Sequence, residues 1–431
     1  MTETSAEIEV VGLCRDLIRL DSSNPTSNER GAAEYVAAQL AEVGIEPTVL
    51  ESAPGRTSVV GRIPGADSAR GALLVHGHLD VVPADAADWQ VDPFAGEIRD
   101  GCVWGRGAVD MKDMDAMTLA ALLARLREGR LPPRDLVVAF VADEEAGGTY
   151  GAQWLVRNHP GLFEGCTEAI SEVGGFSLTV RDDLRLYLIE TAEKGMAWLR
   201  LTATGRAGHG SMINGDNAVT ALCEAVARVG RHTFPVHLTP TVRTFLTEVS
   251  DALGIELDLD DPDRAVAQLG PIARMVGATL RNTVNPTQLD AGYKVNVIPQ
   301  IATAYLDGRF LPGYEAAFET ELDAVLGPDV QREYIHHDIA LETDFDGELV
   351  DAMAAALKAE DNAARVVPYC LSGGTDAKSF STLGIRCFGF SPLRLPPDLD
   401  FTAMFHGVDE RVPIDALRFG VRVLDRFLDG C

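Results

Sequence analysis

The sequence lacks the patterns that would place the protein in a membrane or outside the cell. No apolar run approaches the ~18 residues that a membrane-spanning helix needs, and residues 1–7 have neither the basic region nor the apolar core of a signal peptide. The chain has seven cysteines and no Cys-x-x-Cys pair; they are Cys14, Cys102, Cys166, Cys223, Cys370, Cys387 and Cys431. This scatter is typical of reduced thiols and argues against a disulfide framework or a cysteine-bound zinc. We therefore expect a cytoplasmic protein.

Basic residues are scarce relative to acidic ones. The 431 residues include 37 Lys and Arg against 65 Asp and Glu, which gives a formal net charge of −28. Such a surface repels nucleic-acid phosphates and anionic lipids. We therefore expect neither nucleic acid nor membrane as a partner, and the acidity most simply serves solubility.

Two other site types are also missing. The acidic stretch 256–263 lacks the glycine and the terminal glutamate of a calcium loop, so we expect a solvated loop there. The turn Ser372-Gly-Gly-Thr-Asp376 contains glycines but not the lysine or the spacing of a phosphate-binding loop. The sequence shows no internal repeat or low-complexity tract.

Hydrophobic periodicity predicts an α/β architecture in the first part of the chain. Helical patterns alternate with strand-like runs; the helical patterns cover 6–20, 29–43, 114–127 and 150–157, and the runs cover 57–63, 71–76, 136–142 and 167–171. Alternation of this kind predicts a largely parallel sheet covered by helices.

The pattern changes after Glu193. Residues 196–204 alternate apolar and polar side chains, a helix-like stretch spans 216–230, and further strands are predicted near 279–284, 289–295 and 300–309. A half-buried antiparallel sheet with helices on one face fits this pattern. The length agrees with two to three domains of ~150 residues each.

His78 and Asp80 are the most informative residues. They follow an apolar run, and residues i and i+2 of a strand point the same way. His78 could thus bind a metal while Asp80 bonds its other ring nitrogen and sets the tautomer. Taken alone, a histidine at a strand end is more often structural.

Acidic residues stand at further strand ends. Asp110 follows a glycine-rich turn, Glu144 and Glu145 end a buried-strand pattern, and Glu172 follows the run 168–171. Near the C-terminus, His406 precedes a helix predicted to start at Pro413. Each could be a turn or cap residue. Together they suggest a site, because the carboxyl ends of strands are where α/β sheets build them.

With these motifs the chain resembles the M20 family of metallopeptidases and amidohydrolases, which includes aminoacylases, succinyl-diaminopimelate desuccinylases and glutamate carboxypeptidases. The resemblance covers nearly the whole length. It implies a zinc-exopeptidase-like catalytic domain at 1–193 and 344–431, with helices on both faces of a mostly parallel sheet. An α+β lid or dimerisation domain would be inserted at 194–343.

The resemblance also implies two Zn²⁺ ions per subunit, with Co²⁺ or Mn²⁺ as possible substitutes. One ion would be held by His78, Asp110 and Glu172, and the other by Asp110, Glu145 and His406. Asp80 would orient His78, and Glu144 would be the general base. Two Zn²⁺ with three carboxylates leave a charge of about +1, which suits the activation of water. Glu144 would be free to move protons, since it would point away from Glu145 along an extended backbone. Asp113-Met114 departs from the glycines of many relatives but involves no expected ligand.

Inside the expected lid, glycines flank His209. The resemblance implies that His209 stabilises the oxyanion and that, in dimeric relatives, the partner subunit supplies it, so we expect a homodimer through the lid. Asn296 and Arg309 match positions that bind the substrate carboxylate, and Gly373 and Gly374 match the wall of the substrate pocket. The alternatives are a plain turn histidine for His209 and, for Arg309, a structural salt bridge to Asp307 or to the lid.

The expected function is hydrolysis of an amide bond next to a free carboxylate, as an N-acyl-amino-acid amidohydrolase or carboxypeptidase acting on small N-acyl amino acids or short peptides. In those branches of the family the ligand at Glu172 tends to be Glu, whereas dipeptidases and aminopeptidases tend to have Asp. A dipeptidase or aminopeptidase of the same family is the first alternative. A non-catalytic binding protein on the same scaffold is the second.

Overall fold

The computed structural model describes residues 3–25, 28–269 and 273–431. Its contacts divide the chain into two compact units: the first comprises Met1–Thr191, Thr343–Tyr369 and Thr375–Cys431, and the second comprises Ala192–Glu342 and Cys370–Gly374. We expected residues 370–374 in the catalytic domain. They cluster with the second unit instead, where the Leu371 carbonyl accepts a hydrogen bond from the Lys194 amide at 3.0 Å.

The first unit is built on a sheet with the strand order β1-β2-β6-β3-β7-β18-β9, with β8 and β17 also paired to β9. The strands are β1 Thr48–Ala53, β2 Arg56–Ile63, β3 Ala72–His78, β6 Leu136–Val141, β7 Cys166–Ser171, β8 Ser177–Arg181, β9 Leu184–Glu193, β17 Ala364–Leu371 and β18 Arg386–Gly389. The central pairs β6–β3, β3–β7 and β7–β18 are parallel. This confirms the predicted α/β class with a largely parallel sheet.

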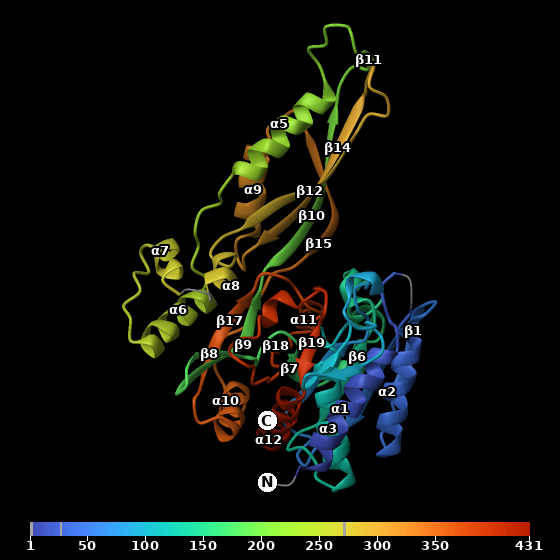
Figure 1. Cartoon of the computed structure of the whole chain (residues 1–431), viewed down its shortest axis with the longest axis vertical. Coiled ribbons are helices and arrows are strands. Elements are labelled where there is room, and N and C mark those ends of the chain that lie inside the picture. Colours follow the sequence, from blue (N-terminus) through green and yellow to red (C-terminus); the bar gives the residue numbers. More distant parts are fainter. Residues whose placement is uncertain (1–2, 26–27, 270–272) are drawn as a thin grey trace. The chain divides into compact units, whose positions relative to one another are not determined.

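Helices cover both faces of this sheet. They are α1 Ser5–Arg19, α2 Arg30–Glu42, α3 Lys112–Arg127, α4 Ala152–Asn158, α10 Glu348–Glu360, α11 Ala377–Ser381 and α12 Ile414–Gly430. Successive residues of β3 face opposite layers, because the His76 ring contacts Phe380 of α11 while Gly77 lies against Asp115 of α3. Every residue of β3 is consequently buried. Figure 1 shows α1 and α2 beside α3, which is itself buried along almost its whole length.

The helices and strands predicted for the first part of the chain are confirmed within two residues at each end. The strand ends predicted to carry the site are therefore real ends of neighbouring parallel strands. A small separate sheet joins β4 Glu97–Arg99, β5 Cys102–Trp104 and β19 Arg411–Pro413. It brings the segment after His406 beside the segment that leads to Asp110.

The second unit contains an antiparallel sheet of order β12-β14-β10-β15. Its elements are β10 Gly195–Thr204, β11 Gly208–His209, α5 Ala218–Arg231, α6 Pro240–Leu253, α7 Pro262–Ala267, α8 Ala273–Gly277, β12 Thr283–Ala291, β13 Val297–Ile298, β14 Ile301–Phe310, α9 Glu315–Leu326, β15 Gln331–Asp338 and β16 Leu341–Glu342. Burial alternates along β10 and β14. Their buried side chains pack with Leu222 of α5 and Phe318 of α9, so the predicted half-buried sheet with helices on one face is confirmed (Figure 1).

Two details of this unit were predicted wrongly. Residues 279–284 and 289–295 do not form separate strands, because β12 runs through from Thr283 to Ala291. Pro286 has no N–H to donate, and the pairing with β14 shifts register between Pro286 and Gln288 without ending the strand. The acidic stretch at 256–263 is a loop only as far as Asp261, which caps α7 by accepting a hydrogen bond from the Arg264 amide.

Within the described residues, none of the helices is long and apolar enough to cross a membrane.

Candidate metal centre

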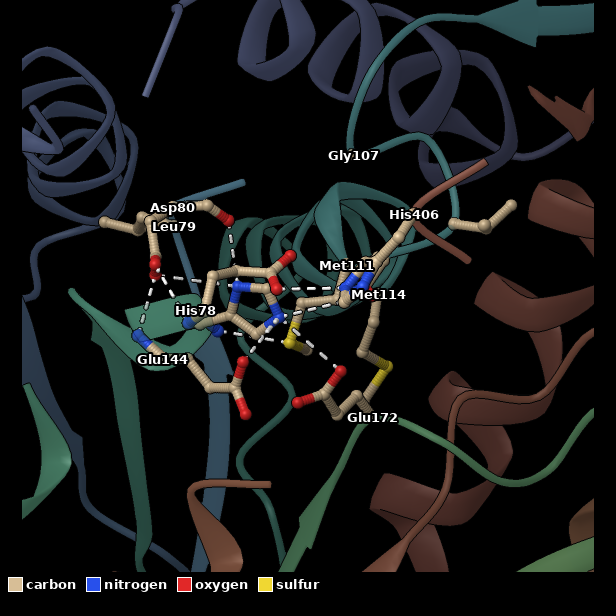
Figure 2. A network of polar contacts seen from close by, with 12 residues as sticks. His78, Leu79, Asp80, Gly107, Met111, Met114, Glu144, Glu172 and His406 are labelled. Atoms are coloured by element: carbon tan, nitrogen blue, oxygen red, sulfur yellow. Dashed lines mark hydrogen bonds and ion pairs between the residues drawn. The ribbon is translucent and has the colours of Figure 1, made fainter. Parts of the chain in front are cut away.

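The strand ends of the first unit bring the expected ligands together (Figure 2). His78 is the last residue of β3, Glu172 follows β7, and Glu144 and Glu145 follow β6. These ends are neighbours because β6, β3 and β7 are adjacent and parallel. Asp110 comes from the turn before α3.

Two groups of side chains share the Asp110 carboxylate. In the first, His78 Nε2 lies 3.1 Å from Asp110 Oδ1 and 3.5 Å from Glu172 Oε2. In the second, His406 Nε2 lies 3.2 Å from Asp110 Oδ2 and 3.0 Å from Glu145 Oε2. Within each group one ligand atom from each residue lies within 4.8 Å of the others. Asp110 thus presents one oxygen to each group, as a bridging ligand would.

The electrostatics of both groups suit cations. Burial raises the pKa of Glu172 to about 7, and nearby Asp110 and Glu145 act in the same direction. Hydrogen bonds with Asp110 and Glu145 raise the pKa of His406 to about 10. In the absence of a metal, these groups therefore favour a proton at the position where a cation would sit. Imidazole nitrogens together with carboxylate oxygens suit zinc, cobalt or manganese.

The hydrogen bond that sets the His78 tautomer differs from the one expected. His78 Nδ1 lies 2.9 Å from the Asp80 backbone carbonyl, whereas the Asp80 carboxylate is 3.7 Å away. A carbonyl only accepts, so Nδ1 carries a proton, and Nε2 is the ring nitrogen that faces Asp110 and would bind a metal once it has lost its own proton. The expectation that the carboxylate makes this bond is corrected. Strand β3 ends at His78, so the alternation that would aim Asp80 beside His78 does not continue.

The Asp80 carboxylate holds the turn of the acidic pair instead. Its two oxygens accept the backbone N–H groups of Glu144 at 3.0 Å and Glu145 at 3.1 Å, and Asn24 Nδ2 donates to the same carboxylate. Asp80 is fully buried. It therefore holds the backbone of Glu144, the expected base, and of Glu145, an expected ligand.

Glu144 and Glu145 lie on a 3₁₀ turn, Glu144–Ala146. We expected their side chains to point apart because the backbone is extended there, and that reason is wrong. Residue Asp143 enters this turn in the left-handed region with φ 70°. Glu144 Oε2 lies 4.0 Å from His78 Nε2. Burial raises the pKa of Glu144 well above its usual value. A carboxyl whose pKa is raised takes up a proton more readily than an ordinary glutamate, which suits a general base.

The expected substrate residues lie in the second unit. His209 pairs with Val297, and its Nδ1 lies 2.8 Å from Ser211 Oγ. The Gly210 amide donates to the Asn296 carbonyl at 2.9 Å, so His209 and Asn296 are neighbours. Both are exposed. Gly373 and Gly374 form a half-exposed turn after β17.

Arg309 is placed elsewhere in the same unit. It makes the salt bridge considered as its alternative, with Nε 2.6 Å from Asp307 Oδ1 and Nη2 3.1 Å from Oδ2. Arg309 lies eight residues along β14 from Ile301, roughly 26 Å at ~3.3 Å per residue. The turn with His209 lies beyond the Ile301 end, where the Gly205 amide bonds the Gln300 carbonyl. The unit does not bring Arg309 to His209 and Asn296.

Asn24 and Glu410 were not expected as site residues. Asn24 donates to Asp80, and buried Glu410 accepts backbone N–H groups from the turn that carries Asp110. Neither belongs to an apolar run that ends in a ligand, so periodicity offered no indication of them.

Comparison with known proteins agrees with the family resemblance noted in the sequence. The family model for peptidase family M20/M25/M40 matches residues 74–430. Aminoacylase-1 of Pongo abelii is 26% identical over 428 residues, covering 97% of this chain and 94% of that protein. The N-fatty-acyl-amino acid synthase/hydrolase PM20D1 of Homo sapiens is 28% identical over 382 residues, covering 84% and 74%.

Solved structures share the fold. The M20 family metallo-carboxypeptidase Sso-CP2 from Sulfolobus solfataricus superposes with a TM-score of 0.75 at 18% identity, covering 98% of this chain and 99% of that one. Human carnosine dipeptidase 1 superposes with a TM-score of 0.68 at 15% identity, covering 98% and 95%.

The position of Asp80 generates a test. Asp80→Asn replaces one acceptor oxygen with an NH₂ group that faces a backbone N–H, so the turn at Glu144 should shift and kcat should fall roughly 10–100-fold. Asn24→Ala removes only the side-chain donor and should cost less. Steady-state kinetics at saturating zinc checks this, and a kcat for Asp80→Asn within threefold of wild type would contradict it.

Proposed function

The chain belongs to peptidase family M20/M25/M40, and from that premise we propose that it is a di-zinc hydrolase that cleaves an amide bond next to a free carboxylate. The observation that carries this proposal is the pair of ligand groups sharing the two oxygens of Asp110. His78, Asp110 and Glu172 would hold one ion, and Asp110, Glu145 and His406 the other. When bound, two divalent cations lower the pKa of a water and polarise the substrate carbonyl.

The residues of the chain then handle the proton. Glu144 accepts it from the attacking water and delivers it to the amide nitrogen, which departs as an amine. Its distance of 4.0 Å from His78 Nε2 places it beside the first ligand group without making it a member. The Asp80 hydrogen bonds hold the backbone of the base in place.

Glu144→Gln should leave both metals bound and lower kcat by ~10²–10⁴-fold, because it removes proton transfer without removing a ligand. Glu145→Gln is the matched control: it changes the adjacent residue of the same turn and should weaken one metal. Metal analysis and kcat are measured together on each variant. Near wild-type turnover in Glu144→Gln would show that the role is misassigned.

The preferred substrates in this proposal are N-acyl amino acids. The similarity to aminoacylase-1 and to the N-fatty-acyl-amino acid synthase/hydrolase PM20D1 supports this class. Glu172, which is one methylene longer than Asp, would take up space that a substrate ammonium needs in a site that carries Asp at this position. The pair with Asp307 uses Nε and Nη2 of Arg309. In the part of the chain that the structure describes, Nη1 of Arg309 makes no hydrogen bond, so it could donate to a substrate carboxylate.

One observation favours the alternative, a dipeptidase or aminopeptidase. Asp376 is 5% exposed, and its Oδ2 has no hydrogen-bond partner among the described residues. Its charge acts on the pKa of Glu144, so it belongs to the electrostatic surroundings of the site. An acid there would pair with a substrate ammonium, which the sequence motifs did not indicate.

A matched panel of N-acyl amino acids and unblocked dipeptides separates the two functions. A buried ammonium without a partner costs several kcal/mol, so kcat/KM should be about 100-fold or more higher for the N-acyl compounds. Higher kcat/KM for the dipeptides would reject the amidohydrolase and favour the alternative with Asp376.

We also propose a homodimer formed through the second unit. Exposed apolar side chains gather around His209 and Asn296, in the segments 212–213 and 293–295; Ile213 is 100% exposed and Tyr293 is 83% exposed. Surfaces of this kind mark protein contacts. Since one copy separates Arg309 from His209 and Asn296, a second copy would supply the latter pair to its partner's site.

Co-expression of His209→Ala with Glu144→Ala tests this assembly. Each variant alone should be inactive, while the mixture should regain partial activity, because one of the two sites in a mixed dimer has all its parts. Activity of the mixture is compared with each variant alone and with light-scattering mass. A fully active wild-type monomer would defeat the dimer.

A further inference from the structure

Glu410 is a buried carboxylate with both oxygens fully used. Oε1 accepts the backbone N–H groups of Val109 at 2.7 Å and Asp110 at 3.2 Å. Oε2 accepts the Gly107 amide at 3.0 Å and Arg106 Nη1 at 2.8 Å. The residue is 0% exposed. One side chain therefore gathers three amides of the turn that carries Asp110.

The backbone of Glu410 continues the same connection. Its carbonyl accepts the Gly105 amide at 3.0 Å, and the next residue, Arg411, pairs with Trp104 where β19 meets β5. The turn 105–111 contains neither helix nor strand. Between the end of β5 and the start of α3, the contacts with Glu410 take the place of regular pairing.

Glu410 also lies four residues after His406. The segment from Met404 to Glu410 has no helix or strand, and two of its residues, His406 and Asp409, have φ values of 58° and 60°. The side chain of His406 is 56% exposed, against 1% for His78. His406 is thus held less by packing than the strand-end ligand.

We propose that Glu410 is a positioning residue that holds Asp110 and His406 in register for the second metal. This inference rests on the proposed two-metal function. Two of the three ligands in the second group lie on segments that Glu410 ties together. Two of the three in the first group, His78 and Glu172, lie at strand ends, so the first metal depends on Glu410 less.

The chemistry of the carboxylate makes this specific. Each oxygen accepts two donors, so an amide in its place would set an NH₂ group against two donors whichever way it is turned. Glu410→Gln keeps the size of the side chain but breaks one half of the connection. Loss of residues that orient metal ligands typically weakens metal binding 10–100-fold.

Zinc competition titrations against a chromophoric chelator test the inference without using activity. We assign the weaker zinc-binding step to the second group, because its His406 is 56% exposed, and in Glu410→Gln this step should weaken by roughly 10–100-fold while the tighter step weakens by less than about threefold. Glu410→Asp keeps the charge but is one methylene shorter, and should show the same order with a smaller change. It also serves as the test variant if Glu410→Gln is recovered only as unfolded protein.

Asp361→Asn is the matched control. Asp361 is also buried and bonds Arg185 Nη2 at 2.8 Å and Tyr187 Oη at 2.9 Å, with no metal ligand among its partners. The Asp361→Asn substitution should lower the thermal stability of the protein and leave the affinities of both zinc-binding steps unchanged. If wild type binds two zinc ions and neither Glu410 variant changes the weaker step more than the tighter one, the positioning role is overturned. If wild type binds fewer than two, the proposed function itself fails.

Discussion

The placement of one carboxylate, that of Asp110, is the constraint on which the candidate site depends. Its oxygens lie 3.1 Å from His78 Nε2 and 3.2 Å from His406 Nε2. A bridging ligand must satisfy two groups at once, and an error in its position affects most the group whose other ligands are held less firmly, which is the group with exposed His406. Two features of the fold position the groups around Asp110. Strand β3 holds His78, and the hydrogen bonds of Glu410 hold the turn of Asp110 relative to His406.

The charges around Asp110 explain why cations fit. Burial raises the pKa of Asp110, but hydrogen bonds from His406 and His78 outweigh burial and lower it, so this carboxylate stays ionised. For Glu145 and Glu144, in contrast, burial outweighs the other effects and raises the pKa. Several buried acids at the ends of adjacent strands repel one another, and divalent cations relieve that repulsion.

Some of the site residues could be predicted from the sequence, and others depend on contacts that the sequence does not show. The ends of β3 and β7 were visible in the sequence because buried parallel strands read as apolar runs, and His78 and Glu172 stand where those runs stop. His406 lies in a segment without regular structure, so the sequence showed it only as an imidazole before a predicted helix, and its role as a ligand came from the family resemblance. The roles of the Asp80 carbonyl and of Glu410 depend on which backbone groups approach in three dimensions, and residue spacing carries no record of that. The continuous β12 was missed because Pro286 resembles a strand end.

Anomalous diffraction at the zinc edge, from crystals grown with zinc, would locate the metal ions themselves. We expect two peaks per chain, one among His78, Asp110 and Glu172 and one among Asp110, Glu145 and His406, with an Asp110 oxygen bound to each. Peaks at other residues, or a single peak that Asp110 does not contact, would contradict it.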